Sequence, residues 1–296
     1  LCLFRMLNLR CVIPTVCRFT GSLSHLAPRS TVLHSRTTVS HQIVTRLIAT
    51  STTVWKKKEV IDGLPTEYEK KIVKSQPDSP SVSGDMAGSK LSLLTWNIDG
   101  LDPKNREIRM LEVYKTVSKI NADFVFLQEV VEPDIDKVMQ LENYNIHFSD
   151  RNSMYFTAIL VSNAFSVRNH EVIPYENSEM GRKLQIIEGT LGSLHVFLLT
   201  THLESLKDAK YSKRRREQLK QCFNKMDSIS KEYPDALIFF GGDLNLRDKE
   251  LCALPDGVAD AWQAAGAPEN EEFTWDTTEN TNKQSNFKVR CRFDRI

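Results

Sequence analysis

The sequence contains no hydrophobic run of the roughly 18 uncharged residues that a membrane span needs, because Arg5 and Arg10 interrupt its most apolar stretch. Its 6 cysteines form no CxxC pair, which argues for a reducing compartment and against a thiolate zinc site. A wholly disordered chain is excluded as well, since 41% of the residues are hydrophobic and 26% are charged. The 296 residues therefore predict one large domain or two small ones, with no membrane segment.

Acidic residues are absent before Glu59. Residues 1–58 carry six arginines and three lysines among many Ser and Thr residues, a composition typical of a mitochondrial transit peptide that begins at Met6. A disordered tail, or upstream sequence translated by mistake, explains the same composition. Residues 59–89 combine a charged segment with a linker rich in Ser, Pro and Gly, so we predict the folded domain over residues 90–296.

Four segments share one pattern, a short run of bulky apolar residues that ends abruptly in polar or acidic ones. Such runs fit strands buried on both faces, and apolar residues at helical spacing over 108–120 and 219–229 predict helices that cover them. Together they predict an α/β fold, a layered sandwich with mixed sheets. The four segments are LSLLTWNID at 91–99, DFVFLQE at 123–129, HVFLLTTHLE at 195–204 and LIFFGGDLN at 237–245. Weaker strands are predicted at 156–162, 165–173, 183–191 and 287–296.

The polar ends of these strands meet at one edge if the strands lie side by side, and open α/β sheets place their ligands at such an edge. Residues two apart on an extended chain also face the same side. Carboxylates packed together repel unless a cation compensates them, and hard oxygen ligands without cysteine favour Mg²⁺ or Mn²⁺. A single polar end is better explained as the start of a loop, but four with the same pattern predict a metal site. The cluster contains Asn97, Asp99, Glu129, His202, Glu204, Asp243 and Asn245.

The motifs TWN, LQE, THLE and GDLN, in this order and at this spacing, resemble those of the endonuclease/exonuclease/phosphatase family of metal-dependent phosphodiesterases. The longer motifs TWNIDGLD, FLQEV, YFTAI, THLES, GDLNLRD, FTWDT and RFDRI resemble one branch of it. That branch releases a tyrosine, or a trapped topoisomerase remnant, from a 5′-phosphate of DNA. The resemblance covers residues 91–296 and implies a four-layer α/β sandwich with two mixed sheets flanked by helices.

The resemblance implies a role for each polar residue. Glu129 and Asp99 bind Mg²⁺ or Mn²⁺, directly or through water, and the metal neutralises charge on a phosphodiester oxygen. Asp243 orients or deprotonates the attacking water. Asp294 orients a catalytic histidine in a following Ser-Asp-His motif. The residues that hydrogen-bond the non-bridging oxygens are Asn97, His202 and Asn245.

No such histidine follows Asp294, because the chain ends at Ile296, and it begins at Leu1 rather than at a methionine. We therefore expect a fragment, truncated at the C-terminus, that lacks the catalytic histidine and the closing strand. Such a chain is expected to turn over slowly and to aggregate.

The resemblance also places four residues around the scissile end, where rings stack on a base or a tyrosine and guanidinium groups bind phosphate. Core packing of the two rings and surface ion pairs of the two arginines are the alternatives. These substrate-binding residues are Tyr155, Arg182, Arg247 and Trp275. Four consecutive basic residues at 213–216 either contact a DNA backbone or form a solvated helix face, and we favour the solvated face.

These features predict a Mg²⁺-dependent hydrolase that acts on DNA with a 5′-phosphotyrosyl end, or with a topoisomerase remnant, in DNA repair. Within the same fold, an apurinic endonuclease, an RNA exonuclease, or an inositol or lipid phosphatase is an alternative. A non-catalytic binding module is another, because the C-terminal histidine is missing. We expect a monomer. The resemblance implies the nucleus, whereas the acid-free leader favours the mitochondrion.

Overall fold

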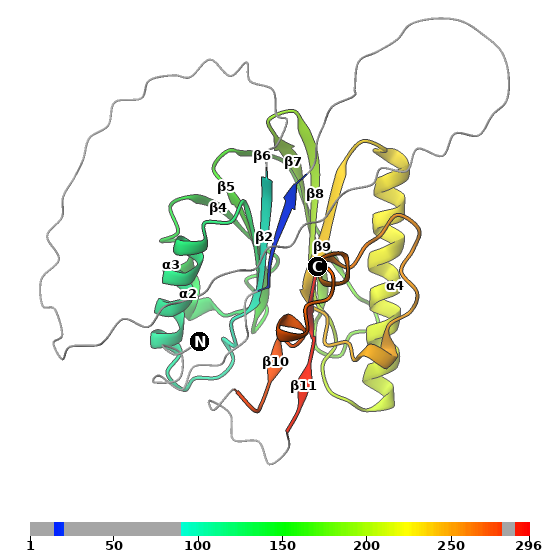
Figure 1. Ribbon diagram of the computed structural model, residues 1–296. Coiled ribbons are helices and arrows are strands. Elements are labelled where there is room, and N and C mark those ends of the chain that lie inside the picture. The colour runs from blue at the N-terminus through cyan, green and yellow to red at the C-terminus, as the bar shows by residue number, and fades with distance from the viewer. Residues whose placement is uncertain (1–14, 21–89, 280–287) are drawn as a thin grey trace, which may run out of the picture.

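The computed structural model describes residues 15–20, 90–279 and 288–296. They form two five-stranded sheets and a two-stranded ribbon. The sheets pack against each other, and helices cover their outer sides, as Figure 1 shows. The fold is therefore the predicted four-layer α/β sandwich with two mixed sheets.

The first sheet contains a parallel pair between antiparallel neighbours. Its strands, in spatial order, are β1 (Thr15–Thr20), β2 (Lys90–Asn97), β3 (Phe124–Val130), β5 (Phe156–Ser162) and β4 (Tyr144–Phe148). β2 and β3 are the parallel pair. Five consecutive residues from Phe124 to Gln128 are buried, which explains the continuous apolar run, because both faces of the strand are covered.

The second sheet repeats this arrangement, with β8 and β9 as its parallel pair. Its strands, in spatial order, are β12 (Asp294–Arg295), β9 (Leu237–Asp243), β8 (Leu194–His202), β7 (Lys183–Leu191) and β6 (Phe165–Pro174). The separate ribbon consists of β10 (Trp275–Asp276) and β11 (Arg290–Cys291). Because parallel strands end at the same edge of a sheet, each sheet delivers two motif ends to one side.

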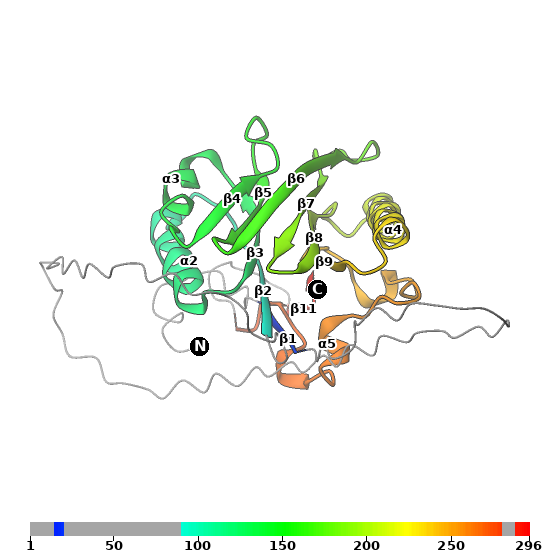
Figure 2. The same ribbon diagram turned by 90° about the horizontal axis from the view of Figure 1, so that it is seen from above.

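Helices form the two outer layers, which Figure 2 shows from above. α2 (Arg106–Ile120) and α3 (Ile135–Val138) pack on the first sheet, and α4 (Ala209–Glu232) packs on the second. The shorter helical turns are η1 (Glu132–Asp134), η2 (Asp248–Glu250), α5 (Ala261–Ala264) and η3 (Glu269–Glu271). Within the described ranges, no helix combines the length and the hydrophobicity that crossing a bilayer requires.

An apolar core between the sheets holds them together. The ring of Phe124 on β3 lies 5.4 Å from that of Phe165 and 6.1 Å from that of Phe239, and Phe126 and Leu198 are fully buried in the same cluster. Each fully buried side chain of this size contributes about 1.5–3 kcal/mol. The contact fixes one sheet against the other, so the strand ends of both sheets form one frame.

Two expectations about the strands need correction. The four motif strands do not lie side by side in one sheet, because β2 and β3 belong to the first and β8 and β9 to the second. The segment 287–296 is not one strand either, because it changes partner: β11 pairs with β10, and β12 pairs with β9. The remaining predicted strands are confirmed, and β1, β4 and β10 were not predicted.

Most of the predicted leader and linker lies outside the described residues. β1, which falls within the predicted leader, pairs antiparallel with β2. The assignments of 1–58 and 59–89 therefore stay predictions. From β2 onward, the described residues form the sandwich expected for 90–296.

Candidate active site

The polar strand ends of both sheets line one groove of about 750 Å³. Tyr155 and Arg182 line a smaller pocket of about 20 Å³, which shares His202 with the groove. The structure thus brings the residues predicted from four distant segments into one place. The predicted site residues that line the groove are Asn97, Asp99, Glu129, His202, Asp243, Asn245, Arg247, Trp275 and Asp294.

Asn97, the last residue of β2, connects the carboxylates of the two sheets. Its Nδ2 donates to Glu129 Oε1 at 3.0 Å and to Asp243 Oδ2 at 2.9 Å, and its Oδ1 accepts from the amide of Asp99 at 2.9 Å. Both hydrogen bonds that the Asn97 amide group donates therefore go to carboxylates, unlike the role towards non-bridging oxygens that the resemblance implies. Its side chain sets the spacing of the acidic groups.

Three of these polar residues have left-handed backbone conformations, which residues other than glycine adopt rarely. The angle φ is 56° at Asp99, 57° at Glu129 and 51° at Asn245. At Glu129, a β-bulge between Leu127 and Val130 accompanies the change, and bulges re-aim side chains next to active sites. The extended geometry assumed for residues two apart therefore stops at the strand ends.

Two glycines allow close approach of the backbones that carry these residues. A Cβ on Gly100 would lie 2.2 Å from the carbonyl oxygen of Glu129, and one on Gly242 would lie 2.1 Å from that of Thr201. Gly242 also has a φ of 141°. Only glycine fits such positions. Gly100 lets the loop after β2 lie against β3, and Gly242 lets β9 lie against β8.

Arg109 of α2 holds the loop that carries Asp99. Its side chain is 5% exposed. It donates to the carbonyl oxygens of Ile98 at 3.2 Å, Asp99 at 2.7 Å and Lys104 at 3.2 Å, and also to that of Asp102. Its Nη1 lies 3.5 Å from Asp99 Oδ2. Hydrogen bonds from a charged donor are stronger than neutral ones, so this arginine fixes the loop.

Arg215 of α4 holds the loop after β8 in the same way. Its fully buried guanidinium donates to the carbonyl oxygens of Glu204 at 2.9 Å, Ser205 at 3.0 Å and Leu206 at 2.6 Å. It also pairs with Glu250 at 2.6 Å. Leu206 has a φ of 69°, an unusual conformation that these bonds maintain.

The solvated face favoured for residues 213–216 is therefore wrong at Arg215, which points into the protein. Burial alone raises the pKa of its partner Glu250. Hydrogen bonds from Arg215, from the Arg247 amide and from Ser212 outweigh burial and hold the pKa of Glu250 at about 2. The carboxylate is thus charged at neutral pH, and the pair is ionic.

Glu204 does not line the groove, although the sequence placed it in the cluster. It is fully buried and accepts hydrogen bonds from Ser178 Oγ at 2.7 Å, the Glu179 amide at 2.8 Å and Gln218 Nε2 at 3.2 Å. Glu204 therefore anchors the loop that leads to Arg182.

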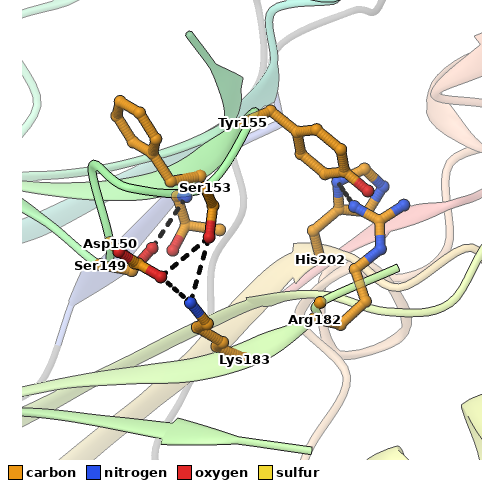
Figure 3. Close-up of a pocket in the computed structure, with 10 residues that line it drawn as sticks. Ser149, Asp150, Ser153, Tyr155, Arg182, Lys183 and His202 are labelled. Carbon is orange, nitrogen blue, oxygen red and sulfur yellow. Dashed lines mark hydrogen bonds and ion pairs between the residues drawn. The ribbon is translucent and has the colours of Figure 1, made fainter. Parts of the chain in front are cut away.

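His202 lines both the groove and the small pocket, and Figure 3 shows it beside Arg182 and Tyr155. Arg182 Nη1 lies 2.6 Å from His202 Nδ1, and Asp243 Oδ2 lies 3.5 Å from His202 Nε2. The Arg182 guanidinium lies 4.9 Å from the centre of the Tyr155 ring. Burial raises the pKa of the Tyr155 phenol, so it stays protonated and donates to the carbonyl oxygen of Met180 at 3.2 Å.

The remaining predicted residues lie on the walls of the groove. Arg247 donates to the carbonyl oxygen of Asn245 at 3.1 Å, and its guanidinium lies 5.5 Å from the centre of the Phe293 ring. Trp275 is half-buried and packs against the core of the first sheet. Asp294 is buried and lies opposite Asp243 in the pairing of β12 with β9.

The donor atoms of the groove suit a hard metal ion. In the part of the chain that the structure describes, no three His, Cys, Asp or Glu side chains are close enough to hold a metal on their own. Mg²⁺, however, keeps several waters and uses only one or two carboxylates. Asp99 and Glu129 both line the groove, and both are joined to Asn97. These residues therefore fit a partly hydrated divalent cation.

Residues 94–296 match the model of the Endonuclease/Exonuclease/phosphatase family. The chain therefore belongs to this family, as its motifs predicted, and phosphodiesterases of this family depend on a metal.

The chain is similar to two proteins that are named as phosphodiesterases. The chain is 47% identical over 213 residues to a Caenorhabditis elegans protein named 5′-tyrosyl-DNA phosphodiesterase. The aligned region covers 72% of this chain and 58% of that protein. It is 34% identical over 227 residues to the Danio rerio protein named tyrosyl-DNA phosphodiesterase 2. Here the aligned region covers 75% of this chain and 60% of that protein. The chain thus spans about 60% of the length of these curated relatives.

Solved structures share the fold. A crystal structure of TDP2 from C. elegans superposes with a TM-score of 0.67 at 48% identity, covering 69% of this chain and 62% of that one. A crystal structure of D. rerio TDP2 complexed with a single-strand DNA product superposes with a TM-score of 0.65 at 35% identity, covering 69% and 82%.

Proposed function

We propose that the protein hydrolyses the bond between a tyrosine, including that of a topoisomerase remnant, and a 5′-phosphate of DNA. The observation that carries this proposal is the groove in which Asn97 joins Glu129 of one sheet to Asp243 of the other. The names of the relatives and the DNA product bound to the D. rerio protein support the substrate class.

In this proposal, Asp99 and Glu129 hold Mg²⁺ or Mn²⁺, which supplies Lewis-acid stabilisation of the phosphodiester when bound. Asp243 orients the attacking water and accepts its proton, because its carboxylate lies beside the acidic cluster. His202 donates a hydrogen bond towards a non-bridging oxygen. Asn97 and Asn245 keep the carboxylates and the loop after β9 in place, and Asp294 supports Asp243 from the neighbouring strand.

The groove walls supply the groups that would bind substrate. Arg247 offers a guanidinium to a phosphate, and Trp275 offers a ring to a base or to the leaving tyrosine. Tyr155 and Arg182 line the small pocket, and Arg182 contacts His202, so we propose that they act through it.

The test uses the full-length protein and compares release of tyrosine from a 5′-tyrosyl oligonucleotide with cleavage of an abasic duplex. We expect tyrosine release that stops in excess chelator and returns with Mg²⁺ or Mn²⁺. Preferential cleavage of the abasic duplex would favour an apurinic endonuclease. Binding of the oligonucleotide with no hydrolysis of either substrate would favour a binding module.

We further propose that the protein acts as a monomer in the nucleus, where its DNA substrate lies. The acid-free leader favours the mitochondrion instead. A fluorescent fusion of residues 6–60 separates these locations, because mitochondrial import would establish the leader as a transit peptide. Light scattering of the purified protein measures its oligomeric state.

A further inference from the structure

Arg182 has an unusual partner for a buried arginine. The residue is 6% exposed, and among the described residues it has no carboxylate within ion-pair distance. Its shortest polar contact is instead the 2.6 Å bond from Nη1 to His202 Nδ1. Burying the charged guanidinium without a carboxylate partner costs folding free energy. The imidazole of His202 is not an anion, so this contact is not a stabilising ion pair.

The contact determines which nitrogen of His202 carries the hydrogen. A guanidinium has five N–H donors and no acceptor, so His202 Nδ1 must accept the bond and cannot itself carry a hydrogen. The hydrogen of the ring then lies on Nε2. This nitrogen is 3.5 Å from Asp243 Oδ2.

Several contacts hold Arg182 in this position. The Tyr155 ring lies against its guanidinium with the centroid 4.9 Å away. The amide of Arg182 donates to Ser178 Oγ at 2.9 Å, and Ser178 Oγ donates to the buried Glu204 at 2.7 Å. Tyr155 itself is held by its bond to the carbonyl oxygen of Met180. The guanidinium is therefore placed on Nδ1 by both sheets, since Tyr155 adjoins β5 and Arg182 adjoins β7.

We propose that Arg182 is a positioning residue that fixes His202 as the neutral Nε2–H tautomer. His202 then presents a hydrogen-bond donor, and not a lone pair, on the side of Asp243. Arg182 thus acts through His202. The inference rests on the proposed function only for the identity of the group that receives this hydrogen bond, a non-bridging phosphodiester oxygen.

The test is ¹⁵N NMR of the histidine side chains in the metal-free protein at neutral pH, with the His202 signals assigned by their loss in His202→Gln. We expect a pyridine-type Nδ1 and a pyrrole-type Nε2 in the wild type. Arg182→Met should lose this pattern, and Arg182→Lys, which keeps a cationic donor, should retain part of it. Lys183→Met removes the neighbouring cation of the small pocket and should leave the pattern unchanged. Circular dichroism checks that each variant is folded.

A hydrogen on Nδ1 in the wild type, or an unchanged pattern in folded Arg182→Met, would overturn the inference. Kinetics form a separate arm: Arg182→Met should lower kcat by about 10²- to 10³-fold, the effect of one misdirected oxyanion donor, with a smaller change in KM. The expected tautomer in a protein that hydrolyses no phosphodiester would support the inference about Arg182 and refute the proposed function.

Discussion

Asp243 uses both carboxylate oxygens as acceptors. Oδ2 accepts from Asn97 at 2.9 Å, and Oδ1 accepts from the amide of Asn245 at 2.9 Å. In Asp243→Asn, the new NH₂ group must face one of these two donors. The substitution therefore removes the proposed base and also disturbs the link between the sheets, while keeping the size of the side chain.

We expect Asp243→Asn to lower turnover of a 5′-tyrosyl oligonucleotide by about 10²- to 10⁴-fold, the usual contribution of an acid–base group. DNA affinity, measured by fluorescence anisotropy, should stay nearly unchanged. Asp256→Asn, on an exposed loop, is the matched control and should keep full activity. Equal losses of affinity and turnover would assign Asp243 to substrate binding instead.

At the scale of elements, each outer helix has two tasks. It covers one sheet with apolar side chains, and it sends one buried arginine to the loop that follows a motif strand. Arg109 binds carbonyl oxygens after β2, and Arg215 binds those after β8. Loops that leave a sheet carry backbone groups without ladder partners, and such groups must be satisfied when buried. The helices thus stabilise the left-handed turns that aim the polar residues.

The ion pair of Arg215 with Glu250 should make stability depend on pH. The pKa of Glu250 is about 2 in the folded protein, below its ordinary value of 4.5. Because the pKa is lower in the folded protein, the ionised carboxylate contributes about 3 kcal/mol to the free energy of unfolding. This contribution is complete at pH values above about 4.5 and is lost as the pH falls towards 2. Urea unfolding from pH 7 to pH 2.5 should show this fall, and Glu250→Gln should lack that part of it. Identical pH slopes for both proteins would contradict the assignment.

The sequence predicts the strands and their polar ends, but it does not predict the contacts of the buried arginines. Continuous apolar runs such as FVFL predict buried strands, and the abrupt polar ends predict the site, because apolar patterning and turn chemistry are local properties of the sequence. Arg109 and Arg215 could not be recognised, since a charged residue on a helix is normally solvated and only the packed fold shows that these two point inwards. The contact of Arg182 with His202 depends on the register of β7 with β8, which pairs Leu184 with Thr201 and which apolar alternation does not specify.

At the scale of the whole molecule, the site is an interface between two similar halves. Each half is a mixed sheet with a parallel pair, and neither contains the full set of polar groups. Glu129 comes from the first sheet and Asp243 from the second, and Asn97 joins them. The apolar core around Phe124 holds the halves in register. A ligand at their junction is therefore coupled to the stability of the entire fold.

Metal binding should accordingly raise the melting temperature. A ligand that binds only the folded state adds about 2.7 kcal/mol at one hundred times its Kd. We expect Mg²⁺ or Mn²⁺ to raise Tm above its value in chelator, and Glu129→Gln to lose most of this rise. In chelator, Glu129→Gln should melt no lower than the wild type, because one negative charge fewer relieves repulsion in the acidic cluster. Glu142→Gln, at an exposed position, is the control and should behave as the wild type does. A metal-dependent rise of the same size in Glu129→Gln would place the cation away from this carboxylate.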